Sequence, residues 1–222
     1  VLGRVNRLLS GRVDAIATAY PDVERLAGKH LGKAHLVGNP VRPEVLALRD
    51  QPFPAFTADG LFRVLVTGGS QGASVLAKIV PEGLSMLPPA LRGRLQVTQQ
   101  CRPEDLEAVR ARYAEYGIPA ELATYFEDMA GRLGDTHLFI GRAGASTIAE
   151  LTAVGRPAIL IPLPFATDDH QAANTREMVA TLVACGLDPA RAILFNQAQV
   201  PQHSELQWLL NGTARMGWLN RM

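Results

Sequence analysis

The apolar residues alternate along the chain between short continuous runs and longer stretches with helical periodicity. The short runs predict strands over residues 13–19, 34–37, 63–67, 94–98, 120–125, 137–140 and 157–161. The helical spacing predicts helices over residues 2–9, 22–30, 71–87, 103–116, 145–154 and 170–183. Strands and helices that alternate in this way form a parallel sheet with helices on both faces. We therefore expect an α/β fold with a doubly wound parallel sheet.

The composition is that of a folded globular protein. Hydrophobic residues make up 47% of the 222-residue chain and charged residues 19%, and the formal net charge is +1. A strong basic excess is typical of nucleic-acid binders, so we expect no nucleic-acid partner. The longest apolar stretch, residues 158–165, contains two prolines and is too short to span a bilayer. Any membrane association is therefore expected to be peripheral.

The two cysteines, Cys101 and Cys185, show neither a CxxC spacing nor partner histidines at metal-ligand spacing. This pattern favours two free thiols in a reducing cytosol. We expect neither a metal site nor a cofactor.

A stretch rich in proline and glycine interrupts the alternating pattern between residues 38 and 60. Such a composition is typical of a domain boundary. We therefore expect the tail of one domain over residues 1–38, an interdomain linker over 39–60 and a second domain over 61–222. The chain begins with Val1 in what reads as the middle of an element, so we expect a piece of a longer protein.

Three turns from a predicted strand into a predicted helix carry residues suited to ligand binding. The first is VTGGSQGA, residues 66–73. Its glycines let a ligand approach backbone N–H groups, and a helix N-terminus carries about half a positive charge, which favours phosphate. Ser70 adds a hydroxyl donor. A phosphate site and an ordinary tight turn with Ser70 as the N-cap both fit this pattern.

The second turn is FIGRAGASTIAEL, residues 139–151. Gly144, Ala145 and Ser146 begin a helix after a strand, which places a second helix N-terminus at the same carboxyl edge of the sheet. Glu150 follows in this helix, and its carboxylate can accept two hydrogen bonds from a vicinal diol such as that of ribose. The alternative is a first-turn glutamate that complements the helix dipole.

The third turn is PLPFATDDHQAAN, residues 162–174. His170 and Gln171 are expected near the sheet edge, where they can bind the hydroxyls of a sugar, and the alternative is that this polar cluster only caps a helix. Arg42 lies in the proline-rich stretch. Its planar guanidinium suits a diphosphate, and the alternative is a solvated loop charge.

Five stretches, in this order, resemble the MurG family of glycosyltransferases: GNPVRPEVL (38–46), VLVTGGSQGASVLAKIVPEGL (64–84), YFEDM (125–129), GRAGASTIAEL (141–151) and PLPFATDDHQAAN (162–174). The resemblance implies a GT-B fold, in which two Rossmann-like domains face a cleft. The second domain binds UDP-GlcNAc, and the first holds a lipid-linked acceptor and contacts the membrane surface. The implied reaction is inverting transfer of GlcNAc from UDP-GlcNAc to undecaprenyl-pyrophosphoryl-MurNAc-pentapeptide (lipid I), giving lipid II. It takes place on the cytoplasmic face of the bacterial inner membrane, in peptidoglycan synthesis, and requires no metal.

Carried over by position, the resemblance implies contacts with UDP-GlcNAc for Arg42, Ser70, Phe126, Ala145, Ser146, Thr147, Ile148, Ala149, Glu150 and Gln171. Arg42 and Ser70 face the donor, with Ser70 near the diphosphate. Phe126 replaces a residue, often isoleucine, that contacts the uracil. Residues 145–150 line the nucleotide, with Glu150 on the ribose hydroxyls, and Gln171 meets the GlcNAc.

The sequence departs from the family in two places. Nearly all of the acceptor domain lies outside it, with the glycine-rich loop and the histidine proposed as general base, so we assign no catalytic residue. The match fades after about residue 179, and residues 181–222 are atypical. We therefore expect a donor-binding half that binds UDP or UDP-GlcNAc but has little or no transferase activity. The alternatives are a non-catalytic uridine-nucleotide-binding module from a truncated gene and another GT-B enzyme of UDP-sugars.

Overall fold

The structure is a computed structural model that describes residues 2–21, 23, 25–26, 28–55, 57, 59–69, 73–161 and 176. The chain forms two compact units, Val1–Met178 and Val179–Met222. The second unit lies outside the described residues. Of the predicted helix over 170–183, only Arg176 is described, and it is helical.

The first 38 residues form a short parallel sheet with two helices. Its elements are α1 (Arg4–Leu9), β1 (Ile16–Thr18), α2 (Gly28–Leu31) and β2 (Ala34–Leu36). In the sheet, Ile16 pairs with Ala34 and Thr18 pairs with Leu36. Several large apolar side chains in this part are exposed, among them those of Val5, Leu8, Leu31, Leu36 and Val37. The described elements around β1 and β2 therefore leave much of their own apolar surface uncovered.

The larger sheet has five parallel strands in the order β5-β4-β3-β6-β7. The strands are β3 (Phe62–Thr67), β4 (Leu95–Gln100), β5 (Ala120–Ala123), β6 (Leu138–Gly141) and β7 (Ala158–Leu160). The register places Val64 of the central β3 opposite Val97 on one side and Leu138 on the other. This sheet confirms the doubly wound α/β fold that the alternating pattern predicted.

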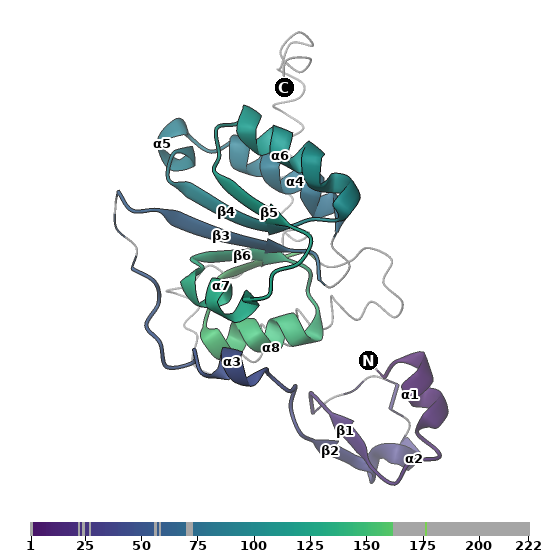
Figure 1. Ribbon diagram of the computed structural model, residues 1–222. Coiled ribbons are helices and arrows are strands. Elements are labelled where there is room, and N and C mark those ends of the chain that lie inside the picture. Colours follow the sequence, from purple (N-terminus) through teal and green to yellow (C-terminus); the bar gives the residue numbers. More distant parts are fainter. Residues whose placement is uncertain are drawn as a thin grey trace, which may run out of the picture. The chain divides into compact units, whose positions relative to one another are not determined.

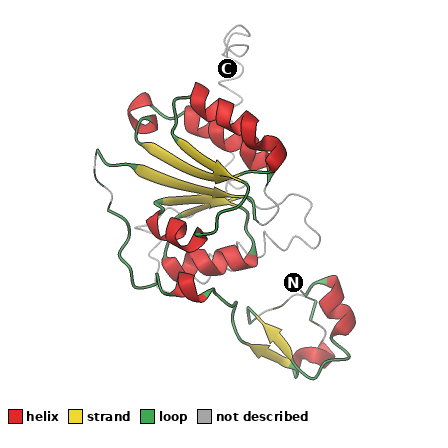
Figure 2. Cartoon of the chain, in the orientation of Figure 1, coloured by secondary structure: helices red, strands yellow, loops and turns green. Residues whose placement is uncertain are grey.

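Helices lie on both faces of the larger sheet (Figures 1 and 2). One face carries α4 (Ser74–Ser85) and α6 (Leu106–Glu115), and the other carries α3 (Pro43–Leu46), α7 (Met129–Asp135) and α8 (Ala145–Val154). Because alternate side chains of a strand point to opposite faces, β3 contributes to both cores. Val64 and Val66 pack with α4 and α6, whereas Leu65 packs with the other three helices.

Short helices account for most of the differences from the predicted elements. The predicted helix over 145–154 coincides with α8, and the one over 103–116 consists of a 3₁₀ turn, η1 (Pro103–Asp105), followed by α6. Neither α3 nor α5 (Pro89–Arg92) was predicted, because each begins at a proline. Proline favours a loop in a sequence pattern, yet it is well suited to the first position of a helix.

Residues 39–60, predicted as an interdomain linker, are attached to the larger sheet near both ends. Near the start, α3 packs on the core beneath α8, and Val45 is fully buried there. Near the end, the Arg94 guanidinium donates to the carbonyl oxygens of Thr57 and Gly60 at 2.7 and 2.8 Å. The domain boundaries stay a prediction, but the packing assigns α3 to the core of the larger sheet.

Candidate functional site

The two strands β3 and β6 mark the point where a ligand site is expected. The chain leaves β3 through α4 toward β4 on one side, and it leaves β6 through α8 toward β7 on the other. Open α/β sheets bind ligands in the crevice that such a reversal creates at the carboxyl ends of the strands. Thr67 and Gly141 pair at this edge. The structure thus brings the turns that begin after β3 and β6 to one place.

Gly141 lets the ends of β3 and β6 approach closely. A Cβ atom at this position would lie 2.5 Å from the carbonyl oxygen of Thr67 and 2.6 Å from the ring of Phe139. Both separations are far below van der Waals contact, and the carbonyl belongs to the backbone of the neighbouring strand. Any larger residue must therefore push the two strand ends apart at the edge where the ligand is expected.

Gly141→Ala is expected to lower the free energy of unfolding by about 1–3 kcal/mol, the usual cost of overpacking a tight site. Urea denaturation measures the loss. Gly83→Ala is the matched control, because Gly83 lies inside α4 with open space at its Cβ position, and there alanine is expected to stabilise by about 0.5–1 kcal/mol. If the free energy of unfolding of Gly141→Ala is equal to or greater than that of Gly83→Ala, the close approach of the two strand ends is contradicted.

The turn after β3 has the backbone that its glycines predict. Gly69 adopts a φ of +83°, in the left-handed region that glycine enters without strain. Residues 70–72 lie outside the described residues, so both the phosphate and the N-cap interpretations of Ser70 stay open. Gln171 and His170, from the third turn, also lie outside the described residues.

Among the described residues, no side chain caps the N-terminus of α8. Its N-cap is Gly144, which has no side chain to bond the first N–H groups, and these groups favour an anion. Ser146 is exposed, and Ala145, Thr147 and Ala149 are partly exposed.

Ile148 differs from the other predicted residues of this turn. Its side chain is buried, and its N–H already donates to the Gly144 carbonyl oxygen at 2.9 Å. Ile148 therefore supports the turn from beneath, and its predicted contact with the nucleotide stays a prediction.

Arg42 and Glu150 form a two-pronged ion pair beside α8. The Arg42 Nε donates to Glu150 Oε1 at 2.6 Å, and Nη2 donates to Oε2 at 3.1 Å. These hydrogen bonds raise the pKa of Arg42. Because of this pair, Arg42 is not the solvated loop charge that was the alternative interpretation.

The helix-dipole interpretation of Glu150 is also wrong. The helix α8 begins at Ala145, so Glu150 is its sixth residue, and its first turn contains no acidic residue. The dipole effect falls off within the first turn, so it gives Glu150 little stabilisation. The side chain of Glu150 is only 16% exposed, and that of Arg42 is 43% exposed. Glu150 is thus a mostly buried carboxylate held by an arginine from a distant segment, and its contact with a ribose stays a prediction.

Phe126, predicted to contact a uracil, is 5% exposed. The guanidinium carbon of Arg132 lies 4.2 Å from the centre of its ring. Arg132 in turn donates to both carboxylate oxygens of Glu121 at 2.6 and 2.7 Å, which lowers the pKa of Glu121. The ring of Phe126 is therefore buried with one face covered by Arg132, and its contact with a uracil stays a prediction.

Tyr125 is a residue of this edge to which the sequence interpretation gave no role. Its side chain is 72% exposed, and it lies close enough to Arg42 to interact with it electrostatically. An aromatic residue just after the end of a strand, here β5, is the sequence signal that identifies it. A tyrosine ring this exposed offers a flat surface on which a base can stack.

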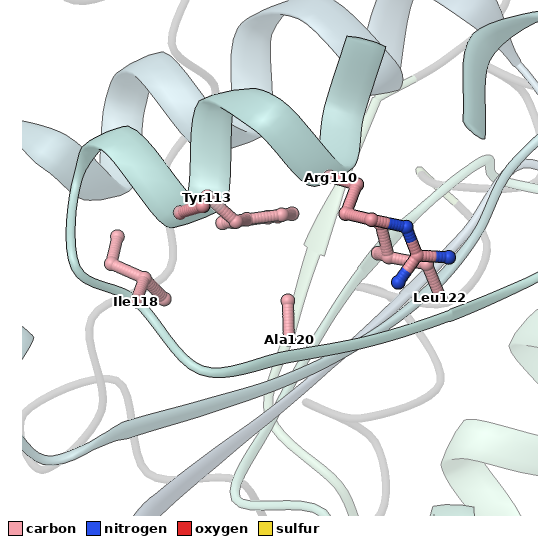
Figure 3. Close-up of a pocket in the computed structure, with 6 residues that line it drawn as sticks. Arg110, Tyr113, Ile118, Ala120 and Leu122 are labelled. Carbon is pink, nitrogen blue, oxygen red and sulfur yellow. The ribbon is translucent and has the colours of Figure 1, made fainter. Parts of the chain in front are cut away.

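Two small hollows lie away from this edge, near the amino ends of the strands. The first, of about 150 Å³, lies between α6 and β5 and is lined by Arg110, Tyr113, Ala114, Ile118, Ala120 and Leu122 (Figure 3). The second, of about 170 Å³, lies beside the end of α7 and the first residues of β3 and β4. Both are smaller than the roughly 300–1,000 Å³ of typical small-molecule pockets, so the carboxyl edge remains the candidate site.

The described residues also bear on the expected thiols, metal ligands and membrane spans. Cys101 is a buried free thiol, and burial raises its pKa to about 11, so it stays protonated and unreactive at neutral pH. Among the described residues, no three His, Cys, Asp or Glu side chains lie together as metal ligands would. No helix within the described ranges has both the length and the apolar character that crossing a membrane requires.

Comparison with known proteins supports the resemblance seen in the motifs. The model of the glycosyltransferase family 28 C-terminal domain matches residues 63–200. A UDP-N-acetylglucosamine–N-acetylmuramyl-(pentapeptide) pyrophosphoryl-undecaprenol N-acetylglucosamine transferase from Novosphingobium aromaticivorans is 80% identical over 180 residues, which cover 81% of this chain and 46% of the relative. A protein of the same name from Zymomonas mobilis is 57% identical over 217 residues, covering 97% of this chain and 56% of the relative. The chain thus spans about half the length of the curated relatives it matches.

A solved structure shows the same likeness. The crystal structure of Acinetobacter baumannii MurG matches with a TM-score of 0.58 and 29% sequence identity, over 82% of this chain and 48% of that chain. The resemblance predicted from the five stretches and the Rossmann-like parallel sheet are both confirmed.

Proposed function

The chain belongs to glycosyltransferase family 28, and from that premise we propose that it is the UDP-GlcNAc-binding half of the enzyme that converts lipid I to lipid II. The relatives carry this activity in their names and are about twice as long as the matched part. The observation that carries the proposal is the Glu150 carboxylate on α8, which Arg42 holds by two hydrogen bonds. The N-terminus of α8 follows β6 and lies at the carboxyl edge of the sheet, where the ligand site is expected.

The proposed donor lies along α8. Its diphosphate meets the N–H groups at the start of α8, with Ser70 on the neighbouring turn. Glu150 receives the ribose hydroxyls. At a rise of about 1.5 Å per residue, the five steps from Ala145 to Glu150 along α8 cover about 7.5 Å, roughly the length of a ribose and its first phosphate. The uracil then lies toward Tyr125 and Phe126, and the GlcNAc reaches Gln171.

The proposed reaction is an inverting displacement at the anomeric carbon of GlcNAc. A base removes the proton from the acceptor hydroxyl while the bond to UDP breaks. Helix N-termini stabilise the negative charge that develops on the departing diphosphate. We propose that the base lies in the acceptor-binding domain, and that residues 1–38 are part of that domain. The exposed apolar side chains around β1 and β2 support this assignment, because a larger domain would cover them. We also propose peripheral association with the cytoplasmic face of the inner membrane, because the resemblance to the MurG family implies it.

Calorimetric titration of the purified chain with UDP-GlcNAc tests the proposal. We expect saturable binding that UDP competes for and that ADP and UDP-glucose compete for much more weakly. We expect no transfer of GlcNAc to lipid I, because the chain holds only the donor side. Absence of saturable binding, or equal competition by ADP, would overturn the proposed function. Equal competition by UDP-glucose would instead favour another enzyme of UDP-sugars.

A further inference from the structure

We propose that Arg42 is a positioning residue, which holds the Glu150 carboxylate in the orientation that receives the ribose hydroxyls, and that it does not bind the diphosphate. The inference rests on the proposed function, because it concerns the nucleotide bound at the same site. It changes the role that the resemblance gave to Arg42, which was to face the donor directly.

The ion pair leaves Glu150 able to bind a diol. An ionised carboxylate offers two oxygens with about four acceptor positions in all. Arg42 uses one position on each oxygen, at 2.6 and 3.1 Å. Each oxygen therefore retains an acceptor position, and two neighbouring hydroxyls match the two that remain. The planar fork also fixes the plane of the carboxylate, which a single charge cannot do.

The backbone that carries Arg42 is fixed to the same helix as Glu150. Arg42 is the N-cap of α3, and Val45 one turn later is fully buried in the core that α8 helps to form. On the other side of Arg42, the Asn39 side-chain amide donates to the Ala145 carbonyl oxygen at 2.9 Å. These two attachments fix the backbone on both sides of Arg42 beside α8, within reach of Glu150.

The surroundings of Arg42 do not favour a phosphate. Its Nε and Nη2 both donate to Glu150, and its Nη1 lies 3.8 Å from a carboxylate oxygen of Glu44. A diphosphate that approached this guanidinium would meet two carboxylates at the same time. Like charges at such distances repel, so the N-terminus of α8 is the better place for the phosphates.

The test compares how the full 222-residue chain binds UDP, 2′-deoxy-UDP and uridine, measured by calorimetry in wild type and in Arg42→Ala, Arg42→Lys and Glu150→Ala. We expect wild type to prefer UDP over 2′-deoxy-UDP by about tenfold or more, the usual value of a hydrogen bond to a charged group. In Arg42→Ala this preference is expected to disappear, while the preference for UDP over uridine stays. Arg42→Lys is expected to behave as Arg42→Ala does, because lysine keeps the charge and loses the fork.

Two further variants sharpen the comparison. The double variant Arg42→Ala/Glu150→Ala is expected to bind UDP no more weakly than Glu150→Ala alone, because residues that act as one unit are not additive. Arg112→Ala is the matched control, since Arg112 is similarly exposed, at 35%, and pairs with Glu82 between α6 and α4. It should leave every nucleotide preference unchanged.

Each other outcome has a distinct meaning. Loss of the preference for UDP over uridine in Arg42→Ala, with recovery in Arg42→Lys, would assign Arg42 to the diphosphate and overturn the inference. Tighter UDP binding by Arg42→Ala would show that the ion pair competes with the ligand, which also overturns it. If wild type binds UDP without regard to the 2′-hydroxyl, the inference fails and the proposed function stands. If wild type does not bind UDP at all, both fail.

Discussion

Glu150→Ala is expected to weaken UDP binding by about tenfold to a hundredfold, because it removes the acceptor of the ribose hydroxyls, and hydrogen bonds to a charged group contribute about 1.5–3 kcal/mol. Calorimetric titration with UDP measures the change. Glu150→Gln keeps one acceptor oxygen without the charge, so its affinity is expected to lie between those of wild type and Glu150→Ala. The fold should survive in both variants, because partly exposed ion pairs contribute about 1 kcal/mol or less, and Arg42 is 43% exposed.

Glu82→Ala is the matched control for Glu150→Ala. Glu82 lies on α4 and pairs with Arg112 at 3.7 Å, so its removal also breaks an ion pair between a glutamate and an arginine. It is far along its helix from the carboxyl edge of the sheet, and UDP affinity should not change. If Glu150→Ala also binds UDP as wild type does, the carboxylate has no part in binding the ribose.

Arg156→Met is expected to lower the free energy of unfolding by about 3 kcal/mol, because it leaves buried carbonyl oxygens without donors at about 1–3 kcal/mol each. Arg156 is 5% exposed and donates to the carbonyl oxygens of Leu133, Gly134 and Val154 at 3.1, 2.7 and 3.2 Å. These groups lie at the ends of α7 and α8, where the helix dipoles favour a cation. The burial lowers the pKa of Arg156, but an arginine remains charged at neutral pH.

Thermal unfolding followed by circular dichroism measures this loss, and a decrease of roughly 6–12 °C in the midpoint corresponds to about 3 kcal/mol in a chain of this size. Arg110→Met is the control, because Arg110 is 53% exposed and pairs across one helical turn with the exposed Glu107 at 3.6 Å. It should change the stability by less than about 0.5 kcal/mol. Equal midpoints for the two variants would contradict the role of Arg156 in joining α7 and α8.

Much of the fold could be predicted because its signals are local. Each strand of the larger sheet overlaps a short strand that the sequence predicted, and α8 begins after Gly144 and is capped by Gly155, whose φ of +66° favours glycine. The short helices were harder to predict. A four-residue helix such as α3 has less than two turns of periodicity, and the burial of Val45 that stabilises it comes from residues distant in the sequence.

The sequence by itself determined the class of fold, the family, and the turns at which a ligand site is expected, because apolar periodicity and glycine placement are properties of neighbouring residues. The tertiary structure alone decided what those residues do to one another. Arg42 and Glu150 lie 108 positions apart, and no local pattern relates them. They meet because α3 packs on α8 through a shared core. In the same way, the sequence shows Arg156 only as a charged residue that follows Gly155. It becomes a buried donor to three carbonyl oxygens because the C-terminal ends of α7 and α8 meet around it.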